Sequence, residues 1–432
     1  MQKRVREPIP LTLALANCMI KVTHIISNLD GGGAETMLYR LLCRMDTARF
    51  ENEVISLTDL GTLAGKIRLA GVPVRALGMK RGTPNPFPVV RLGQWIRKSK
   101  PQIVQTWMYH ANLVGGLAAR LAGQIPVVWG IHQANLDPQL NKLLTVWTAK
   151  GCARMSVWLP RCVLFVSQAA LLLHTRLGYS ARRMEVIPNG FDLQEFSPDS
   201  AARLSLRREL GIAEDALVIG MAAHFRPEKD HRNFVRAAAR IHNSAREVHF
   251  VLCGLGVTRD NQQLVKWIAD AGIQSRCHLL GQRTDIPRFF SGIDIATSSS
   301  LSEAFPLSVG EAMACGTPCV VTNVGDSALI VGSTGRVVAP GNPDALAEAW
   351  RELIESGPGM RRYLGMAARH RVQQHFSLSA TVERYQAVYE KVAGTAPLNM
   401  REPIPVSCLP ANPGLPVSEA TLGQRVSSKA NL

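Results

Sequence analysis

Two glutamates, Glu303 and Glu311, stand eight positions apart where a predicted loop passes into a predicted helix. A strand of small and apolar residues, 293–299, precedes the first glutamate, and another, 319–321, follows the helix. Interior glutamates are costly unless they are hydrogen-bonded, so this spacing fits two polar contacts to separate parts of one long, hydroxyl-rich ligand. In a parallel sheet such contacts lie at the carboxyl ends of the strands. The alternative is a helix with a glutamate near its N-terminus beside an unrelated loop glutamate.

Three basic residues, His224, Arg226 and Lys229, follow another predicted strand, 218–221. An arginine binds a diphosphate through its planar fork, and a lysine binds it as a point charge. A solvated charged turn explains the same residues. Their position at the carboxyl edge of a sheet favours a binding role.

Gly32 and Gly33 stand between a predicted strand, 21–27, and a predicted helix, 34–44. Small residues at this position let backbone N–H groups approach a phosphate at the helix N-terminus. A dinucleotide-binding fingerprint is not supported, because Thr36 occupies the place of its last glycine. A plain tight turn fits the two glycines equally well.

Two histidines, His110 and His132, come just beyond predicted strand ends in the first half of the chain. Each can hydrogen-bond a substrate, and each also fits as a residue that enters a helix. The chain has no Asp-x-Asp sequence and no His, Cys and carboxylate cluster with metal-ligand spacing, which disfavours a metal-held nucleotide. A bound diphosphate would then be neutralised by cations and helix ends.

Predicted strands and helices alternate through both halves of the chain, which is typical of α/β proteins with doubly wound parallel sheets. We therefore expect two Rossmann-like domains that face each other across a cleft. The expected parts are an N-terminal extension (1–19), a first domain (20–197), a second domain (198–375), a helix free to pack back on the first domain (376–394) and a disordered tail (395–432).

The net charge of +16 is unevenly distributed. Residues 1–200 carry 24 Lys and Arg against 12 Asp and Glu, whereas residues 201–432 carry 25 against 21. A basic half fits an anionic membrane surface, a diphosphate-bearing acceptor or a nucleic acid. No nucleic-acid-binding module is recognisable, so nucleic acid is not an expected partner. Nine cysteines without a C-x-x-C pair predict reduced thiols in a reducing compartment.

Together these motifs resemble the retaining, nucleotide-sugar-dependent glycosyltransferases of family 4 (group 1), which have the GT-B architecture. The resemblance covers roughly residues 20 to 392 and is most specific at 300–318. The segments that carry it are Gly32-Gly33-Ala34-Glu35, His132, Val166-Ser167, Ile187-Pro188-Asn189-Gly190-Phe191-Asp192, 300–306 and 311–318.

The resemblance implies that the first domain binds the acceptor and the second binds a nucleotide-diphosphate sugar. It implies catalytic roles for Glu303, which would face the transferred sugar, and for His132, which would hydrogen-bond it. The implied donor-binding residues are Gly32, Gly33, His224, Arg226, Lys229, Phe305, Leu307, Ser308 and Glu311, the last on the ribose hydroxyls. Family members usually carry arginine where this chain has His224, so either His224 or Arg226 takes the place of that arginine, and Arg226 is the suggested substitute.

A retaining outcome without a protein nucleophile implies a front-face mechanism, in which the leaving diphosphate accepts the proton of the acceptor hydroxyl. We expect neither a metal nor another cofactor. The expected activity is sugar transfer to a saccharide or a polyprenyl-diphosphate-linked saccharide in cell-surface polysaccharide biosynthesis. The alternatives are a catalytically weak sugar-nucleotide-binding partner in a polysaccharide-assembly complex and a sugar-nucleotide epimerase with the same fold.

A basic first domain also fits peripheral contact with an anionic membrane, with the protein in the cytoplasm or on the inner face of the plasma membrane. The expected contact residues are Trp147, Arg154, Trp158 and Arg161. No apolar run approaches the roughly 18–20 residues needed to cross a bilayer.

Overall fold

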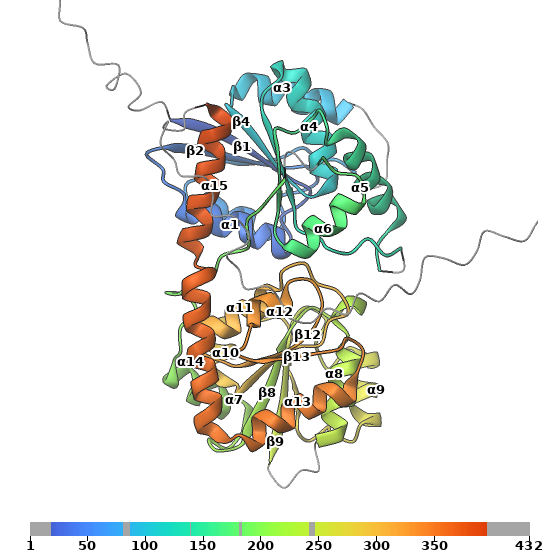
Figure 1. Ribbon diagram of the computed structural model, residues 1–432, viewed down its shortest axis with the longest axis vertical. Coiled ribbons are helices and arrows are strands. Elements are labelled where there is room, and N and C mark those ends of the chain that lie inside the picture. Colours follow the sequence, from blue (N-terminus) through green and yellow to red (C-terminus); the bar gives the residue numbers. More distant parts are fainter. Residues whose placement is uncertain (1–18, 81–86, 139, 181–183, 242–246, 395–432) are drawn as a thin grey trace, which may run out of the picture. The chain divides into compact units, whose positions relative to one another are not determined.

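The computed structural model describes residues 19–80, 87–138, 140–180, 184–241 and 247–394. These residues form two α/β domains, each built on its own parallel sheet (Figure 1). The first 18 residues of the predicted N-terminal extension and the whole predicted tail lie outside the described residues.

The first domain contains a seven-stranded sheet in the order β3-β2-β1-β4-β5-β6-β7. Its strands are β1 Ile20–Ile26, β2 Phe50–Ser56, β3 Val74–Ala76, β4 Ile103–Trp107, β5 Val127–Ile131, β6 Cys162–Phe165 and β7 Met184–Val186. Its helices are α1 Gly33–Arg44, α2 Ala64–Leu69, α3 Phe87–Ser99, α4 Tyr109–Gly123, α5 Leu143–Met155 and α6 Gln168–Arg176. All neighbouring strands pair in parallel, so helices cover both faces of the sheet.

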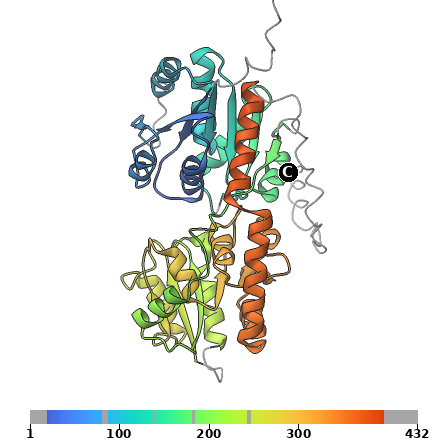
Figure 2. The same cartoon turned by 90° about the vertical axis from the view of Figure 1, so that its left-hand side faces the viewer.

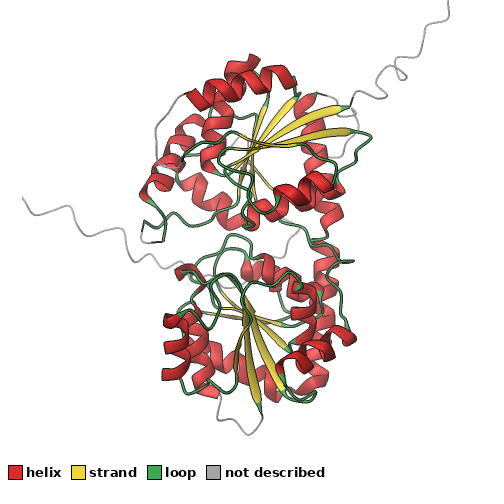
Figure 3. Ribbon diagram, turned by 180° about the vertical axis from the view of Figure 1, so that it is seen from behind, coloured by secondary structure: helices red, strands yellow, loops and turns green. Residues whose placement is uncertain are grey.

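Burial explains why β5 is apolar along its whole length, and why the two polar side chains of β4, Gln105 and Thr106, are both hydrogen-bonded. Every residue of both strands is buried, as expected for a parallel sheet covered on its two faces. Helix α1 shows the complementary pattern, because it buries the predicted stripe of Met37, Leu38 and Leu41 against the sheet. Figure 3 shows strands flanked by helices in both domains.

The second domain contains a six-stranded sheet in the order β10-β9-β8-β11-β12-β13. Its strands are β8 Leu217–Ala222, β9 Val248–Cys253, β10 Cys277–Leu279, β11 Ile295–Ser298, β12 Cys319–Thr322 and β13 Arg336–Val338. Its helices are α7 Ser200–Leu210, α8 His231–Ile241, α9 Gln262–Asp270, α10 Ile286–Gly292, α11 Leu307–Ala314, α12 Ser327–Val331, α13 Pro343–Glu355 and α14 Gly357–His375. The predicted class, two doubly wound parallel sheets, is confirmed.

Helix α7 begins at Ser200, just after the expected boundary between the two domains at 197 and 198. The side chain of Asp199 accepts a hydrogen bond from the backbone N–H of Ala202 at 2.9 Å and caps the helix. Asp199 is exposed, so this helix begins on the surface of the protein.

The chain passes between the domains twice, and the two passages are hydrogen-bonded to each other. The backbone N–H of Phe191 donates to the carbonyl of Phe376 at 2.9 Å, and the N–H of Leu378 donates to the carbonyl of Phe191 at 3.0 Å. After this second passage the last helix, α15 Leu378–Ala393, lies along the first domain, whereas α14 lies along the second (Figure 2).

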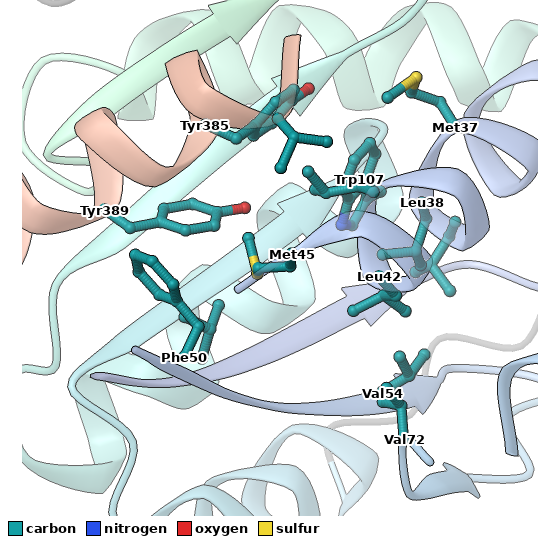
Figure 4. Close-up of a cluster of buried hydrophobic side chains, with 14 of the residues drawn as sticks. Met37, Leu38, Leu42, Met45, Phe50, Val54, Val72, Trp107, Tyr385 and Tyr389 are labelled. Atoms are coloured by element: carbon teal, nitrogen blue, oxygen red, sulfur yellow. The ribbon is translucent and has the colours of Figure 1, made fainter. Parts of the chain in front are cut away.

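Helix α15 completes the core on one face of the first sheet. Tyr385 stacks on Trp107 of β4 with 6.0 Å between ring centroids, and Tyr389 is fully buried beside Phe50 (Figure 4). The hydroxyl of Tyr389 donates to Oε1 of Gln105 at 3.2 Å. Helix α15, the last helix of the described residues, is therefore part of the first domain.

Within the described part of the chain, no helix is both long enough and apolar enough to span a bilayer.

We predict that Tyr389→Ala lowers the free energy of unfolding by about 3–5 kcal/mol, because it removes a fully buried ring from the core. Tyr389→Phe keeps the ring and leaves one buried amide oxygen without its donor, so its cost is about 1 kcal/mol. Urea unfolding followed by circular dichroism measures both variants. Equal stability of wild type and Tyr389→Ala would mean that α15 is not part of the first core.

Candidate functional site

The strand order of the second sheet reverses between its neighbours β8 and β11, the position at which open α/β sheets bind ligands. Lys229 lies in a short 3₁₀ turn after β8, and Glu303 lies in the loop after β11. The Nζ atom of Lys229 donates to Oε1 of Glu303 at 2.5 Å, and the hydroxyl of Ser300 donates to the same oxygen at 2.8 Å. The structure thus joins two of the predicted site residues in one ion pair, with side chains 26% and 11% exposed.

Backbone contacts fix the loop that carries Glu303. The backbone N–H of Leu301 donates to the carbonyl of Glu228 at 2.8 Å, which ties this loop to the turn that carries Lys229. Gly325 backs the loop with a φ of +55°, and a Cβ there would lie 2.2 Å from the carbonyl oxygen of Glu303. Glycine is required at Gly325 both by its φ and by this close approach.

The other two predicted basic residues of this site differ in their charge state. Burial and the nearby Arg226 and Lys229 lower the pKa of His224, so its imidazole is neutral at pH 7. The side chain of Arg226 is 61% exposed, and its guanidinium lies 3.8 Å from the carboxylate of Glu228. Of the two candidates for the second diphosphate cation, Arg226 is the charged one.

Helix α11 begins directly after the Glu303 loop, and no side chain caps it. Leu307 and Ser308 are its first residues, so their backbone N–H groups have no partner within the helix. Phe305 differs from these two, because its ring is buried and stacks on Phe191 at 6.1 Å between centroids. The predicted site can use Phe305 only through its backbone.

The N-terminus of α1 is occupied by a side chain of the helix itself. The carboxylate of Glu35 lies beside the backbone of Gly32, and burial raises its pKa. A glutamate at this position of a helix is typical of a capping box. Gly33 is exposed, and a Cβ there would lie 3.8 Å from Leu307, so the two helix N-termini are near each other. A diphosphate approaching Gly32 and Gly33 would meet the carboxylate of Glu35.

Glu311 is paired with an arginine of the first domain, a contact that the sequence analysis does not predict. NH2 of Arg40 donates to Oε1 of Glu311 at 2.6 Å, and both side chains are buried. The structure therefore joins Lys229 to Glu303 and Arg40 to Glu311, so the two glutamates have separate cationic partners.

His132 directly follows β5 and lies against Trp107, with 5.2 Å between ring centroids. Burial lowers the pKa of its imidazole to about 4, so the ring is neutral. Its Nδ1 atom is buried and has no hydrogen-bond partner among the described residues. The neighbouring Met108 has a φ of +72°, a strained conformation of the kind that concentrates at functional sites. His110 instead becomes the second residue of α4.

Asp326, at the start of α12, makes a second contact with the first domain that the sequence analysis does not predict. Its carboxylate accepts hydrogen bonds from the backbone N–H groups of Gln168 at 2.8 Å and Ala169 at 3.0 Å, at the N-terminus of α6. Burial raises its pKa. Neither Asp326 nor Arg40 belongs to a spacing pattern. For Arg40 the one available signal is a charged residue beside the apolar stripe of α1.

Among the residues that the structure describes, no three or more His, Cys, Asp or Glu side chains lie close enough to hold a metal ion. The cysteines in this part of the chain are free thiols.

Two family models match the chain and together span both domains. The model described as Glycosyltransferase Family 4 matches residues 31–195, and the model described as Glycosyl transferases group 1 matches residues 203–371. The predicted family resemblance is confirmed by these matches.

Named relatives are glycosyltransferases of several kinds. A D-inositol 3-phosphate glycosyltransferase of Salinispora tropica is 31% identical over 427 residues, with 88% of this chain and 86% of that protein covered. A UDP-Gal:α-D-GlcNAc-diphosphoundecaprenol α-1,3-galactosyltransferase of Escherichia coli is 28% identical over 248 residues. That match covers 56% of this chain and 63% of the relative.

Solved structures confirm the fold. HepE of Anabaena, determined in complex with UDP-glucose, superposes with a TM-score of 0.75 at 21% identity. The match covers 86% of this chain and 100% of HepE. The matched relative and family models, taken with two doubly wound sheets, show that the chain belongs to the group 1 glycosyltransferases, hexosyltransferases with the GT-B fold.

Proposed function

We propose that this protein transfers a hexose from a nucleoside-diphosphate sugar to a saccharide or lipid-linked saccharide, with retention of anomeric configuration and without a metal ion. The observation that carries the proposal is the Lys229–Glu303 pair where the strand order of the second sheet reverses. A retaining transferase of this kind needs a cation for the leaving diphosphate and a carboxylate near the sugar, and this pair supplies both.

The diphosphate would be held by positive charge that the site already contains. Lys229 and Arg226 supply full charges, and the uncapped N-terminus of α11 supplies the N–H groups of Leu307 and Ser308. Lys229 is bound to Glu303 without a ligand, so a diphosphate would share this ammonium with the carboxylate. His224 is neutral and can contribute a hydrogen bond but no charge.

In the reaction, the bond between the anomeric carbon and the diphosphate oxygen breaks while the acceptor oxygen forms a bond on the same face of the sugar. The acceptor proton passes to the departing phosphate oxygen, so no protein base is consumed. The transition state resembles an oxocarbenium ion, and the Glu303 carboxylate near the sugar stabilises its positive charge. The free Nδ1 of His132 can hydrogen-bond a sugar hydroxyl, because its imidazole is neutral.

We predict that Glu303→Ala and Lys229→Ala each lower kcat by about 10²–10³-fold, the usual cost of removing a charge-stabilising group from a transfer site. UDP-galactose and UDP-glucose are the first donors to test, because they occur with the named relatives. Release of UDP in the presence of an acceptor measures the rate. Lys266→Ala, on the exposed face of α9, is the matched control. Near-normal turnover in both site variants would remove these assignments.

Metal independence and retention of configuration can each be tested directly. We expect EDTA to leave the transfer rate unchanged, because the described residues contain no metal-ligand cluster and cations supply the positive charge. Proton NMR of the product should show the same anomeric configuration as the donor. Restoration of activity by Mg²⁺ or Mn²⁺ after EDTA would disprove metal independence, and an inverted product would disprove the retaining mechanism.

The first domain has the charge expected for an acceptor that is presented at a membrane. Residues 60–184 contain 17 Lys and Arg and a single acidic residue, Asp137. The Escherichia coli relative is named for a lipid-diphosphate-linked saccharide acceptor. We propose an acceptor of this class for the present chain, in cell-surface polysaccharide synthesis on the cytoplasmic face of the plasma membrane.

Helix α5 and the turn after it form the surface that fits this membrane. The helix buries Ala149 and Cys152, while the side chains on its other face are exposed: Leu143 64%, Leu144 58% and Trp147 70%. Exposed cations stand on both sides of these apolar residues in the sequence, Lys142 before them and Lys150 and Arg154 after them, and Lys150 lies over the ring of Trp147. An apolar stripe within basic residues is the pattern of a helix that lies in the headgroup layer of an anionic membrane.

Two of the predicted membrane-contact residues follow α5. The ring of Trp158, 47% exposed, lies under Arg120 of α4 at 5.4 Å, and Arg161 is exposed nearby in sequence. The predicted residues Trp147, Arg154, Trp158 and Arg161 are all on the protein surface.

We predict that the protein binds vesicles containing phosphatidylglycerol and not pure phosphatidylcholine, with binding that weakens as salt rises. Lys150→Ala should weaken binding about fivefold, since one basic residue near an anionic surface contributes about 1 kcal/mol. Trp147→Ser should weaken it by a similar factor or more, through lost apolar burial. Vesicle flotation measures the bound fraction.

The matched control for this surface is Met366→Ser, since Met366 lies on α14 of the second domain and is 74% exposed. This variant should bind vesicles as wild type does. Equal binding to both vesicle types, or an unchanged Trp147→Ser variant, would contradict the assignment of α5.

A further inference from the structure

Arg40 is a buried arginine at which three parts of the chain meet. It lies in the middle of α1 in the first domain, and its residue is only 8% exposed. Its guanidinium donates to Glu311 on α11 of the second domain and lies over the ring of Phe196, in the segment that leads into the second domain, at 5.2 Å. One side chain therefore contacts both domains and the segment between them.

The burial of this pair is not explained by stability. Removing two charges from water opposes their attraction, and apolar residues of similar size often stabilise a protein as well or better. A buried pair of this kind is better explained by the orientation that it imposes on its members. Here the planar guanidinium is held by the Phe196 ring, so the direction of its N–H groups toward Glu311 is set.

The pair also leaves hydrogen-bonding capacity on both partners. Arg40 reaches Glu311 through NH2, and its NH1 atom is buried without a hydrogen-bond partner in the described part of the chain. Glu311 accepts this bond on Oε1, which leaves its second oxygen for another donor. A carboxylate fixed through one oxygen is suited to accept a hydroxyl on the other.

We propose that Arg40 is a positioning residue for donor recognition, which holds the carboxylate of Glu311 directed at the ribose of the nucleotide. The inference rests on the proposed function in one respect, the contact of Glu311 with the ribose hydroxyls. It adds that the first domain contributes to a donor site otherwise built on the second. Donor affinity then depends on the contact between α1 and α11.

The test is a double-mutant cycle on Arg40→Met and Glu311→Gln, read out as the Kd of UDP by titration calorimetry and as donor KM and kcat. Arg40→Met should raise Kd and KM about tenfold, within the usual range of coupling between sites, and change kcat by less than about threefold. The double variant should bind UDP no more weakly than Glu311→Gln alone, because Arg40 acts through Glu311. Additive losses in the cycle would overturn the proposal.

Arg40→Lys separates charge from geometry and serves as a second variant if Arg40→Met does not fold. Lysine keeps the positive charge but lacks the planar fork. Its Kd for UDP should lie between those of wild type and Arg40→Met. A Kd as low as that of wild type would show that charge alone is needed, and would overturn the positioning role.

Two control variants test whether Arg40 acts only by holding the domains together. Arg44→Met removes an arginine one turn along α1 that pairs with Asp192 at 2.6 Å, and Asp326→Ala removes another contact between the domains. Both should leave the Kd of UDP within about twofold of wild type. A tenfold rise in either variant would reduce Arg40 to a general domain contact.

The same variants test the donor site at Glu311 and the role of Arg40 separately. If Glu311→Gln leaves the Kd of UDP and the donor KM unchanged, the ribose assignment of Glu311 is wrong, and the proposed donor site is wrong with it. If Glu311→Gln weakens donor binding and Arg40→Met does not, the donor site stands and the role of Arg40 is wrong. If UDP binds the wild-type protein weakly, repeating the titrations with GDP shows whether the site is weak for both nucleotides or prefers guanine to uracil.

Discussion

The ion pair between Lys229 and Glu303 depends on the way the chain leaves β8 and β11. These strands are neighbours in the sheet. From β8 the chain continues to β9 on one side of the pair, and from β11 it continues to β12 on the other side. The loops diverge there, and only side chains and a ligand can occupy the space between them. A carboxylate that is 11% exposed needs a cation, which the turn after β8 supplies. The charges of the site are thus balanced before any ligand arrives.

The first domain reverses its strand order in the same way, between β1 and β4, but its residues there are of another kind. Beyond β4 comes the strained Met108, and beside it lies the neutral ring of His132 against Trp107. At the corresponding helix N-terminus, that of α1, the carboxylate of Glu35 lies beside Gly32. One domain therefore presents a charged strand edge and the other a largely neutral one, which fits a division between a diphosphate donor and a hydroxyl acceptor.

The sequence was sufficient to predict the class of fold, because buried parallel strands are apolar runs and the helices between them have apolar residues at helical spacing. It was also sufficient to single out Lys229 and Glu303, because each follows a strand and carries a charge. It could not reveal that Glu311 pairs with Arg40, 271 positions away, since one sequence records no partner over that distance. Nor could it reveal that Asp326 binds the N-terminus of α6, because the groups that Asp326 binds are backbone N–H groups, which every residue except proline has. The neutral state of His224 required the burial and the neighbouring cations to be known.

The return of the chain to the first domain at α15 sets an order of folding during synthesis. The first sheet is complete once β7 has left the ribosome, but one face of its core still lacks Tyr385 and Tyr389. About 200 residues, including the whole second sheet, must be translated before these two side chains arrive. The second domain can finish first, although it is made later. Until then the side of the first sheet that carries Trp107 and Phe50 lacks the apolar cover that α15 gives it.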